Sequence, residues 1–333
     1  SGGSEKTKAY MSVSYLNDKG YVPNSGFRRV SARAKIDQNV AKWLKAGLNI
    51  AYSNTNQNQF GAESSGSYSN IFFFGQNIAP IYPIYQYDLE TGERLYSENG
   101  ETLYDWGEKR AYGQLSNPYG QLLSSTLNSV RDNMSSRGYL DFDILKDLKF
   151  TVNLAYDIFN TKSDNYTTPV GGDAATVNGR GRQSTSRYSA LNTNQLLSWT
   201  PSFGPSHEHN LSLLLGHEIK SDTSYGLSGE MTNFVDPTVS DFANAVVYQN
   251  LSSSRTSYFL QGIFSRGEYS YANRYFVSAS YRRDASSRFA PDKRWGSFWA
   301  VGASWNAKQE SFLLPVAWVD YLKFKASYGT QGN

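Results

Sequence analysis

The chain has 333 residues, with 32 Lys and Arg against 29 Asp and Glu, so its net charge is +3. No stretch approaches the ~20 apolar residues of a membrane-spanning helix. Charges of both signs are spread along the chain, which argues against nucleic acid as a partner. The absence of Cys excludes disulfides, thiolate metal sites and a cysteine nucleophile. With 25 Tyr, 18 Phe and 7 Trp, the chain carries enough apolar surface to be ordered.

Two-residue alternation of apolar and polar side chains dominates, which predicts β-strands with unlike faces. In residues 29–36, for example, Val, Ala, Ala and Ile alternate with Arg, Ser, Arg and Lys. Strand-like runs cover residues 9–15, 29–36, 44–53, 139–144, 149–157, 187–199, 210–219, 256–271, 274–283, 295–306 and 322–328. We therefore predict an all-β, antiparallel protein with about eleven strands and no amphipathic helix.

The predicted connections alternate between short and long. Short ones fall near residues 37–42, 145–147, 200–209 and 272–274. Long ones cover 55–130, 162–185 and 222–255, with medium ones near 17–26 and 284–294. This arrangement is typical of a transmembrane β-barrel, whose periplasmic turns are short and whose extracellular loops are long.

The composition of the two strand faces supports the same interpretation. We expect the apolar face, which includes Val30, Leu48, Val152 and Phe324, to touch lipid, with aromatic residues such as Tyr52 and Tyr156 near strand ends as an interfacial girdle. The opposite face carries charges that we expect to line a hydrated lumen: Arg29, Arg33, Lys35, Lys45, Asp141, Asp143, Lys323 and Lys325. Soluble antiparallel sheets also alternate, so a soluble all-β carbohydrate-binding protein stays open.

Candidates for chemistry are few. His207 and His209 form an H-x-H pair with Glu208 and His217 as further ligands, but a solvated turn is the favoured interpretation. Asp141 and Asp143 could act as glycosidase acids, yet solvated lumen acids fit them better. We expect no catalytic residue, no metal and no cofactor.

The 55–130 loop is the best functional candidate, because long loops tend to be functional or disordered and disordered linkers lack aromatic residues. Two uses compete for the aromatic side chains of this loop: stacking on sugar rings or peptide side chains, and contact with a partner protein. We favour the partner contact for most of these side chains. The candidate contact residues are Phe72, Phe73, Phe74, Tyr82, Tyr85, Trp106 and Tyr112.

The closing third carries a family likeness. Residues 281–291 (YRRDASSRFAP), 294–298 (RWGSF) and 321–333 (YLKFKASYGTQGN) resemble motifs of the SusC/RagA family of TonB-dependent outer-membrane transporters, and residues 4–10, 77–85 and 117–119 also fit. The motif residues are Arg283, Asp284, Ser287, Arg288, Phe289, Trp295 and Gly296. The charged set Arg282, Arg283, Asp284 and Arg288 could bind substrate, but an ion-paired rim that orders the loop between two strands is favoured.

The resemblance implies a barrel of about 22 strands with a plugged lumen. It also implies import of a large nutrient, an oligosaccharide or oligopeptide, with a SusD-like surface lipoprotein as lid and TonB as the energy link. We expect residues 1–333 to be part of one barrel domain, with the plug, the TonB contacts and further strands elsewhere in a longer protein. Such a protein would not be an enzyme. A passive outer-membrane pore or assembly barrel is the alternative.

Overall fold

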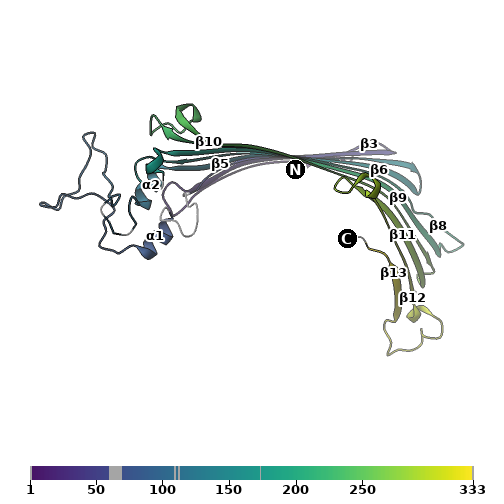
Figure 1. The fold of residues 1–333 in the computed structure, drawn as a ribbon. Coiled ribbons are helices and arrows are strands. Elements are labelled where there is room, and N and C mark those ends of the chain that lie inside the picture. The colour runs from purple at the N-terminus through teal and green to yellow at the C-terminus, as the bar shows by residue number, and fades with distance from the viewer. Residues whose placement is uncertain (1, 60–69, 109, 112, 173, 332–333) are drawn as a thin grey trace.

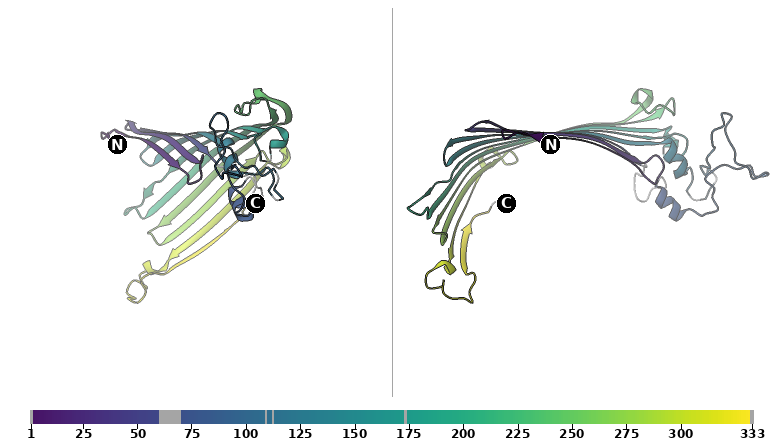
Figure 2. Two further views of the ribbon diagram at one scale, coloured as in Figure 1. Left: turned by 90° about the vertical axis from the view of Figure 1, so that its left-hand side faces the viewer. Right: turned by 180° about the vertical axis from the view of Figure 1, so that it is seen from behind.

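The computed structural model describes residues 2–59, 70–108, 110–111, 113–172 and 174–331. Within these ranges, 13 strands form one antiparallel sheet in a single layer (Figure 1). Strand order follows chain order, except that the short β8 pairs with β9 beside the main path. The layer bends into an arc (Figure 2). The all-β class and the antiparallel arrangement predicted from the alternation are confirmed.

The elements have the following bounds. The strands are β1 (Gly2–Gly3), β2 (Thr7–Lys19), β3 (Gly26–Ala41), β4 (Leu44–Asn58), β5 (Thr126–Leu145), β6 (Leu148–Thr167), β7 (Arg180–Trp199), β8 (Ser202–Phe203), β9 (His209–Phe234), β10 (Ala245–Tyr271), β11 (Tyr275–Ser286), β12 (Trp295–Asn306) and β13 (Lys323–Gly329). The helices are α1 (Ile71–Asn77) and α2 (Pro118–Ser124), with short 3-10 turns η1 (Ala175–Val177), η2 (Phe242–Asn244), η3 (Pro291–Lys293) and η4 (Ala307–Gln309). No helix in the described ranges is long and apolar enough to cross a membrane.

The connections separate the two ends of the sheet. At one end, called the turn end, lie residues 42–43, 146–147, 200–208, 272–274 and 307–322. At the other, the loop end, lie the described residues of the connections 20–25, 59–125, 168–179, 235–244 and 287–294, together with α1 and α2 (Figure 1). The predicted alternation of short and long connections therefore holds, apart from the long 307–322 connection at the turn end.

The sequence did not indicate the two short helices α1 and α2, and the bounds predicted for two of the long loops were wrong. Asn70 and Asn117 cap α1 and α2 by accepting backbone N–H groups, but each helix is too short to show a helical period in the sequence. The loops predicted at 162–185 and 222–255 shrink to 168–179 and 235–244, because β6, β7, β9 and β10 continue through Ser- and Thr-rich sequence that does not alternate. Tyr52 and Tyr156 consequently lie inside β4 and β6, not at their ends.

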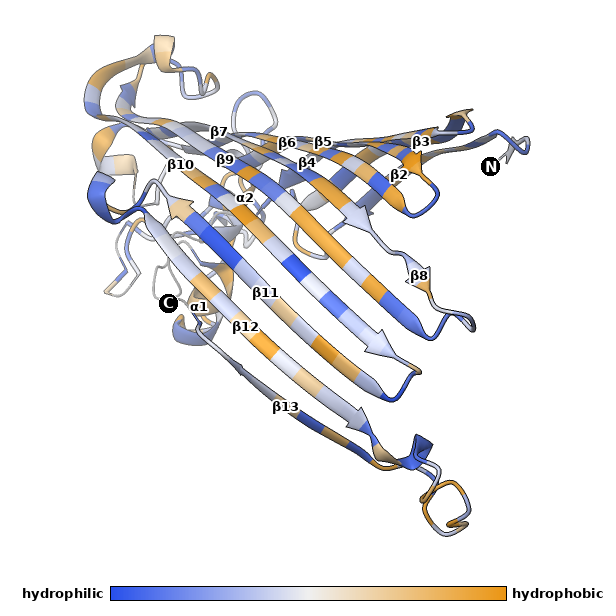
Figure 3. Cartoon of the chain, turned by 90° about the vertical axis from the view of Figure 1, so that its right-hand side faces the viewer, coloured by the Kyte–Doolittle hydropathy of each residue, from blue (hydrophilic) through white to orange (hydrophobic). Residues whose placement is uncertain are grey.

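The register keeps each face of the sheet continuous from strand to strand. Ala34 pairs with Ile50, and Tyr156 pairs with Leu191, so apolar residues of successive strands share one face. The banding is visible along the strands in Figure 3. All eight charged residues predicted to share the polar face do so by register. We call the two sides of the sheet the apolar face and the polar face.

No second layer covers the apolar face in the described part of the chain. Met11 is 73% exposed and Phe324 is 55% exposed, and Val30 and Leu48 are exposed as well. The buried apolar residues are instead few and lie at strand ends or in the connections, mostly toward the loop end: Val22, Leu122, Tyr166, Ala174, Phe234 and Ala307. An ordinary globular core is therefore not what positions these strands.

A glutamate organises the long connection at the turn end. Glu310 accepts hydrogen bonds from the Tyr275 hydroxyl at 2.5 Å, the Trp305 indole at 3.0 Å and the Arg274 guanidinium at 3.2 Å. The bond from Tyr275, followed by that from Trp305, lowers the pKa of Glu310 below its ordinary 4.5. The carboxylate thus ties the ends of β11 and β12 to the 307–322 connection.

The expected consequence is a pH dependence of stability. A lowered carboxyl pKa contributes stability that is complete above the ordinary value of 4.5 and is lost as the pH falls through the lowered value. Melting temperatures of the full-length protein and of Glu310→Gln, compared from pH 7 to pH 3, should converge below pH 4.5. A constant difference between the two proteins down to pH 3 would contradict this assignment.

Candidate functional site

The polar face carries a network of compensated charges. Several pairs lie two residues apart on one strand, as in Lys35–Asp37 at 2.9 Å and Lys220–Asp222 at 3.2 Å. Others join neighbouring strands, as in the two-bond pair of Arg137 with Asp157 at 2.8 and 2.9 Å. Because these pairs are largely solvent-exposed, each contributes little to stability. Their effect is to keep this face wet and to offset part of its positive charge.

The predicted acid pair belongs to this network. Asp143 lies 3.8 Å from Lys45 and 3.9 Å from Lys149, and Asp141 accepts a 2.7 Å hydrogen bond from Thr151. Two carboxylates that are flanked by lysines and a hydroxyl suit a solvated wall. Nothing in this geometry sets one of them up as a general acid.

The motif residues near 283 divide between the two faces. Arg282 holds Asp284 at 2.7 Å and reaches Glu218 of β9 at 3.2 Å, all on the polar face. Strand alternation sends Arg283 to the apolar face, where its guanidinium lies 4.9 Å from the Trp295 ring centroid. The ion pairs therefore join residues within the strands β9 and β11 on the polar face. They do not form the rim that was expected to order the loop.

Other contacts order that loop. The Ser287 hydroxyl accepts a hydrogen bond from the Phe259 N–H at 2.9 Å, and Arg288 lies 4.4 Å from the Tyr258 ring centroid. Phe289 is exposed, and Gly296 pairs with Asp284 across β11 and β12.

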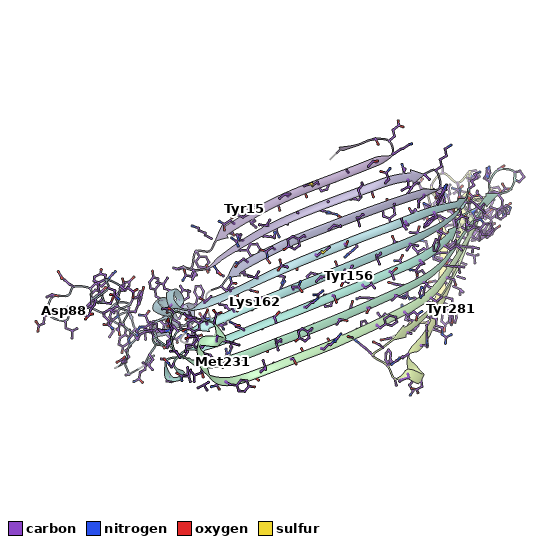
Figure 4. All side chains as sticks on the ribbon, turned by 90° about the horizontal axis from the view of Figure 1, so that it is seen from above. Tyr15, Asp88, Tyr156, Lys162, Met231 and Tyr281 are labelled. Atoms are coloured by element: carbon purple, nitrogen blue, oxygen red, sulfur yellow. The ribbon has the colours of Figure 1, made fainter. Side chains whose placement is uncertain are left out.

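Part of the connection between β4 and β5 folds into a small ordered unit, residues 78–108, 110–111 and 113–124, that we call the loop module. Isolated bridges Tyr85–Tyr104, Tyr87–Arg94 and Tyr96–Thr102 make an irregular hairpin. Asp88 closes its tip by accepting from the N–H groups of Thr91 and Glu90, and these bonds lower the Asp88 pKa. The tip projects beyond the loop end of the sheet, as the labelled Asp88 shows (Figure 4).

Aromatic residues hold the loop module together. The rings of Tyr85, Tyr104 and Tyr119 lie 5.8 to 6.3 Å apart, and burial raises the Tyr104 pKa. Arg94 covers Tyr85 at 3.7 Å. Trp106 packs on the backbone of Gly171, where an added Cβ would lie 2.2 Å from the indole. Tyr85 and Trp106 therefore have packing roles that the sequence did not reveal.

Two polar side chains anchor the module from inside. Asn117, which is 3% exposed, donates to the carbonyls of Ile84 and Asp105 at 2.6 and 3.0 Å. Arg110 bonds the Asp105 carboxylate at 2.9 Å and lies 4.9 Å from the Tyr82 ring centroid.

Apolar side chains remain exposed on the outside of the loop module. Leu89 is 100% exposed and Ile81 is 80% exposed, joined by Ile84, Tyr87, Leu95 and Tyr96. Aliphatic members of this set were missed because the sequence search favoured aromatic residues. Among the predicted contact residues, Phe72 is exposed on α1, Phe73 and Phe74 are half-buried there, and Tyr112 lies outside the described residues.

The histidines have local structural partners. His209 stacks on Phe203 with centroids 5.0 Å apart and bonds the Tyr269 hydroxyl at 2.7 Å. His217 bonds Gln195 and Gln261 at 2.8 and 3.0 Å. His207 sits in the turn with a positive φ of 54°. In the described part of the chain, no three His, Asp or Glu side chains gather as metal ligands.

The chain is similar in sequence to known TonB-dependent receptors. No protein-family profile matches the chain. Over its full length, however, the chain is 27% identical to TonB-dependent receptor P39 of Formosa agariphila and 24% identical to TonB-dependent receptor SusC of Bacteroides thetaiotaomicron. It covers 30% and 33% of those proteins, so it spans about a third of their length.

Solved structures agree on the fold. The RagAB peptide importer in its closed-closed state matches with a TM-score of 0.75 at 22% identity, over 99% of this chain and 36% of that chain. The ferric citrate transporter FecA matches with a TM-score of 0.51 at 9% identity, over 92% of this chain and 38% of that chain. In sequence and fold the chain is therefore similar to about a third of a SusC/RagA-like TonB-dependent transporter, within its barrel. Its location is the outer membrane.

The anchors of the loop module in this SusC/RagA-like chain are open to test. Asn117→Ala removes the donor for two carbonyls and the cap of α2, and should destabilise the module by about 2–3 kcal/mol. Limited proteolysis of the full-length protein should then cut faster within residues 84–105. Asn70→Ala, which removes only the cap of α1, is the matched control and should leave that rate unchanged. Equal cleavage of the Asn117 variant and the wild type would refute the anchoring role.

Proposed function

We propose that the chain supplies barrel wall and extracellular loops of a SusC-like importer, which carries a large nutrient across the outer membrane with energy from TonB. The observation that carries this proposal is the uncovered apolar face of a single-layer sheet. A soluble sheet would cover that face with a second layer, whereas a barrel wall turns it toward lipid. The turn end then faces the periplasm and the loop end the exterior.

The polar face lines the lumen under this proposal. Its charges of both signs, many of them paired, keep a wide passage wet without excluding neutral solutes, which suits oligosaccharides and oligopeptides. Arg29, Arg33, Lys35, Lys45, Asp141, Asp143, Lys323 and Lys325 are the proposed lumen residues. The plug and the TonB contacts belong to the remainder of the longer protein, so residues 1–333 serve as part of one barrel domain.

The exposed residues of the loop module support a partner at the loop end. Ile81, Leu89 and Tyr96 are apolar side chains on a hairpin ordered by its own contacts, and such patches mark interaction sites. A SusD-like surface lipoprotein acting as a lid fits this surface, and the structurally similar RagAB is a peptide importer. Phe72, Phe73, Phe74 and Tyr82 are proposed contacts for lid or ligand, and so are the motif residues Ser287, Arg288 and Phe289.

The lipid-facing assignment predicts an asymmetric response to charge on one strand. Leu154→Arg places a guanidinium on the apolar face of β6 and should cost about 2–4 kcal/mol in the membrane. Thr151→Arg, on the polar face opposite Asp141, should change stability by less than about 0.5 kcal/mol. Guanidinium unfolding of the full-length protein in lipid vesicles measures both. Equal costs would contradict a lipid-facing surface.

Energised import is tested by uptake in cells that carry the full-length protein. Labelled oligosaccharides and oligopeptides should enter only while the inner-membrane proton gradient is intact, and a protonophore should reduce uptake to background. Uptake that persists without the gradient would instead favour a passive pore.

A variant in which residues 87–96 are replaced by a short Gly-Ser turn should lose co-purification of the lid while the barrel still inserts.

A further inference from the structure

Three adjacent strands bring two arginines and a tyrosine together near the loop end. Arg187 of β7 pairs in register with Tyr225 of β9, and Tyr225 pairs with Arg255 of β10. Neighbouring strands are about 4.8 Å apart, so the two arginine Cα atoms lie about 10 Å from each other. We call these three residues the Arg–Tyr–Arg row.

The row points to the apolar side of the sheet. Alternation along β7 puts Arg187 on the same face as Leu191, Leu197 and Trp199, and along β10 it puts Arg255 on the face of Phe259 and Ile263. Under the proposed function this is the outward face, and the inference rests on that proposal.

The height of the row matches a membrane interface. At about 3.3 Å per residue and a tilt near 40°, the stretch from Trp199 at the turn end to Arg187 rises about 30 Å, slightly more than an apolar band of ~25 Å. Lys162 of β6, which lies toward the same end of the sheet (Figure 4), marks a similar level. The row therefore sits where lipid headgroups of the outer leaflet begin.

The guanidinium groups of the row have no partner in the described part of the chain, and both arginines are exposed. Lys162 on the same face is different, since Asp164 lies 3.2 Å from it. Tyr225 between the arginines is 42% exposed. The positions one step below the row are small hydroxyl residues, Ser189, Thr223 and Ser257, which leave a shallow polar floor.

We propose that the Arg–Tyr–Arg row binds a phosphate group of a phosphorylated glycolipid in the outer leaflet. Guanidinium groups form paired, charge-assisted hydrogen bonds with phosphate, and the tyrosine hydroxyl and the serine and threonine floor can bond sugar or phosphate oxygens. Charge complementarity selects this occupant, because two unpaired cations at headgroup height face the anionic groups of such a lipid. An acidic partner protein is the competing occupant.

The test uses the full-length transporter, purified in mild detergent, with purified lipid A as the probe. Binding is measured by native mass spectrometry against lipid A, against dephosphorylated lipid A and in competition with inorganic phosphate. Arg187→Gln/Arg255→Gln should lose lipid A binding by roughly a hundredfold, since each charge-assisted bond contributes about tenfold. Dephosphorylated lipid A should bind the wild type as weakly as lipid A binds the variant.

A matched control removes two positive charges from the other face. Arg33→Gln/Arg131→Gln changes arginines that bond Asn49 and Thr161 on the polar face and should retain wild-type lipid A binding. A heat-modifiable gel shift, checked for each variant, establishes that the barrel is folded.

Any of three results would overturn the proposal: unchanged lipid A binding by the Arg187/Arg255 variant, equal loss in the polar-face control, or competition by inorganic phosphate as effective as by lipid A. A fourth result would do the same: the variant keeps lipid A binding but no longer binds an acidic partner protein that the wild type binds. Failure of the proposed function is distinguishable, because a wild-type protein without a heat-modifiable shift would show that the apolar face does not meet lipid at all.

Discussion

Backbone hydrogen bonding between strands that follow one another in the chain is the interaction on which this structure depends. Each long strand inside the sheet is hydrogen-bonded to the strand before it and the strand after it, so its peptide groups are satisfied without a second layer. That property matters in hydrocarbon, where an unpaired N–H or C=O costs several kcal/mol. The continuous register also keeps the alternating apolar side chains of successive strands on one surface, which lets a chain with few buried residues remain ordered.

The two faces of the sheet differ in what they present to their surroundings. The polar face spreads compensated charges over many strands, so water stays bound there and no single group dominates. Along β7 the apolar face runs from Trp199 and Leu197 through Gln195, which bonds His217 of β9, to Leu191 and then to Arg187 toward the loop end. Beyond the strands, the loop module packs on itself through Tyr85, Tyr104 and Tyr119, and it rests on Gly171 through Trp106.

Sequence reasoning recovered what alternation encodes and missed what tertiary contacts decide. The strand faces and the two kinds of connection follow from a period of two, so the eight charged residues of the polar face were identified correctly as one surface. Strand ends were missed in β9 and β10 because their Ser-rich segments pair with neighbouring strands although their apolar and polar residues do not alternate. The split of Arg282 and Arg283 between faces follows from alternation along β11, but the motif was interpreted as a loop rim although the predicted strand at 274–283 contains both residues. The Arg–Tyr–Arg row required the register, since its members are far apart in the chain.

The neighbour-only order of the strands has a consequence for how the sheet forms. Most strands need to find only the next one along the chain, and closing a short connection carries a small entropic cost. The exception is the step from β4 to β5, which must bring together residues on either side of the 59–125 segment. Assembly by successive hairpins should therefore pause there, and collapse of the aromatic cluster in that segment, by shortening the effective loop, would set the rate at which the two halves of the wall join.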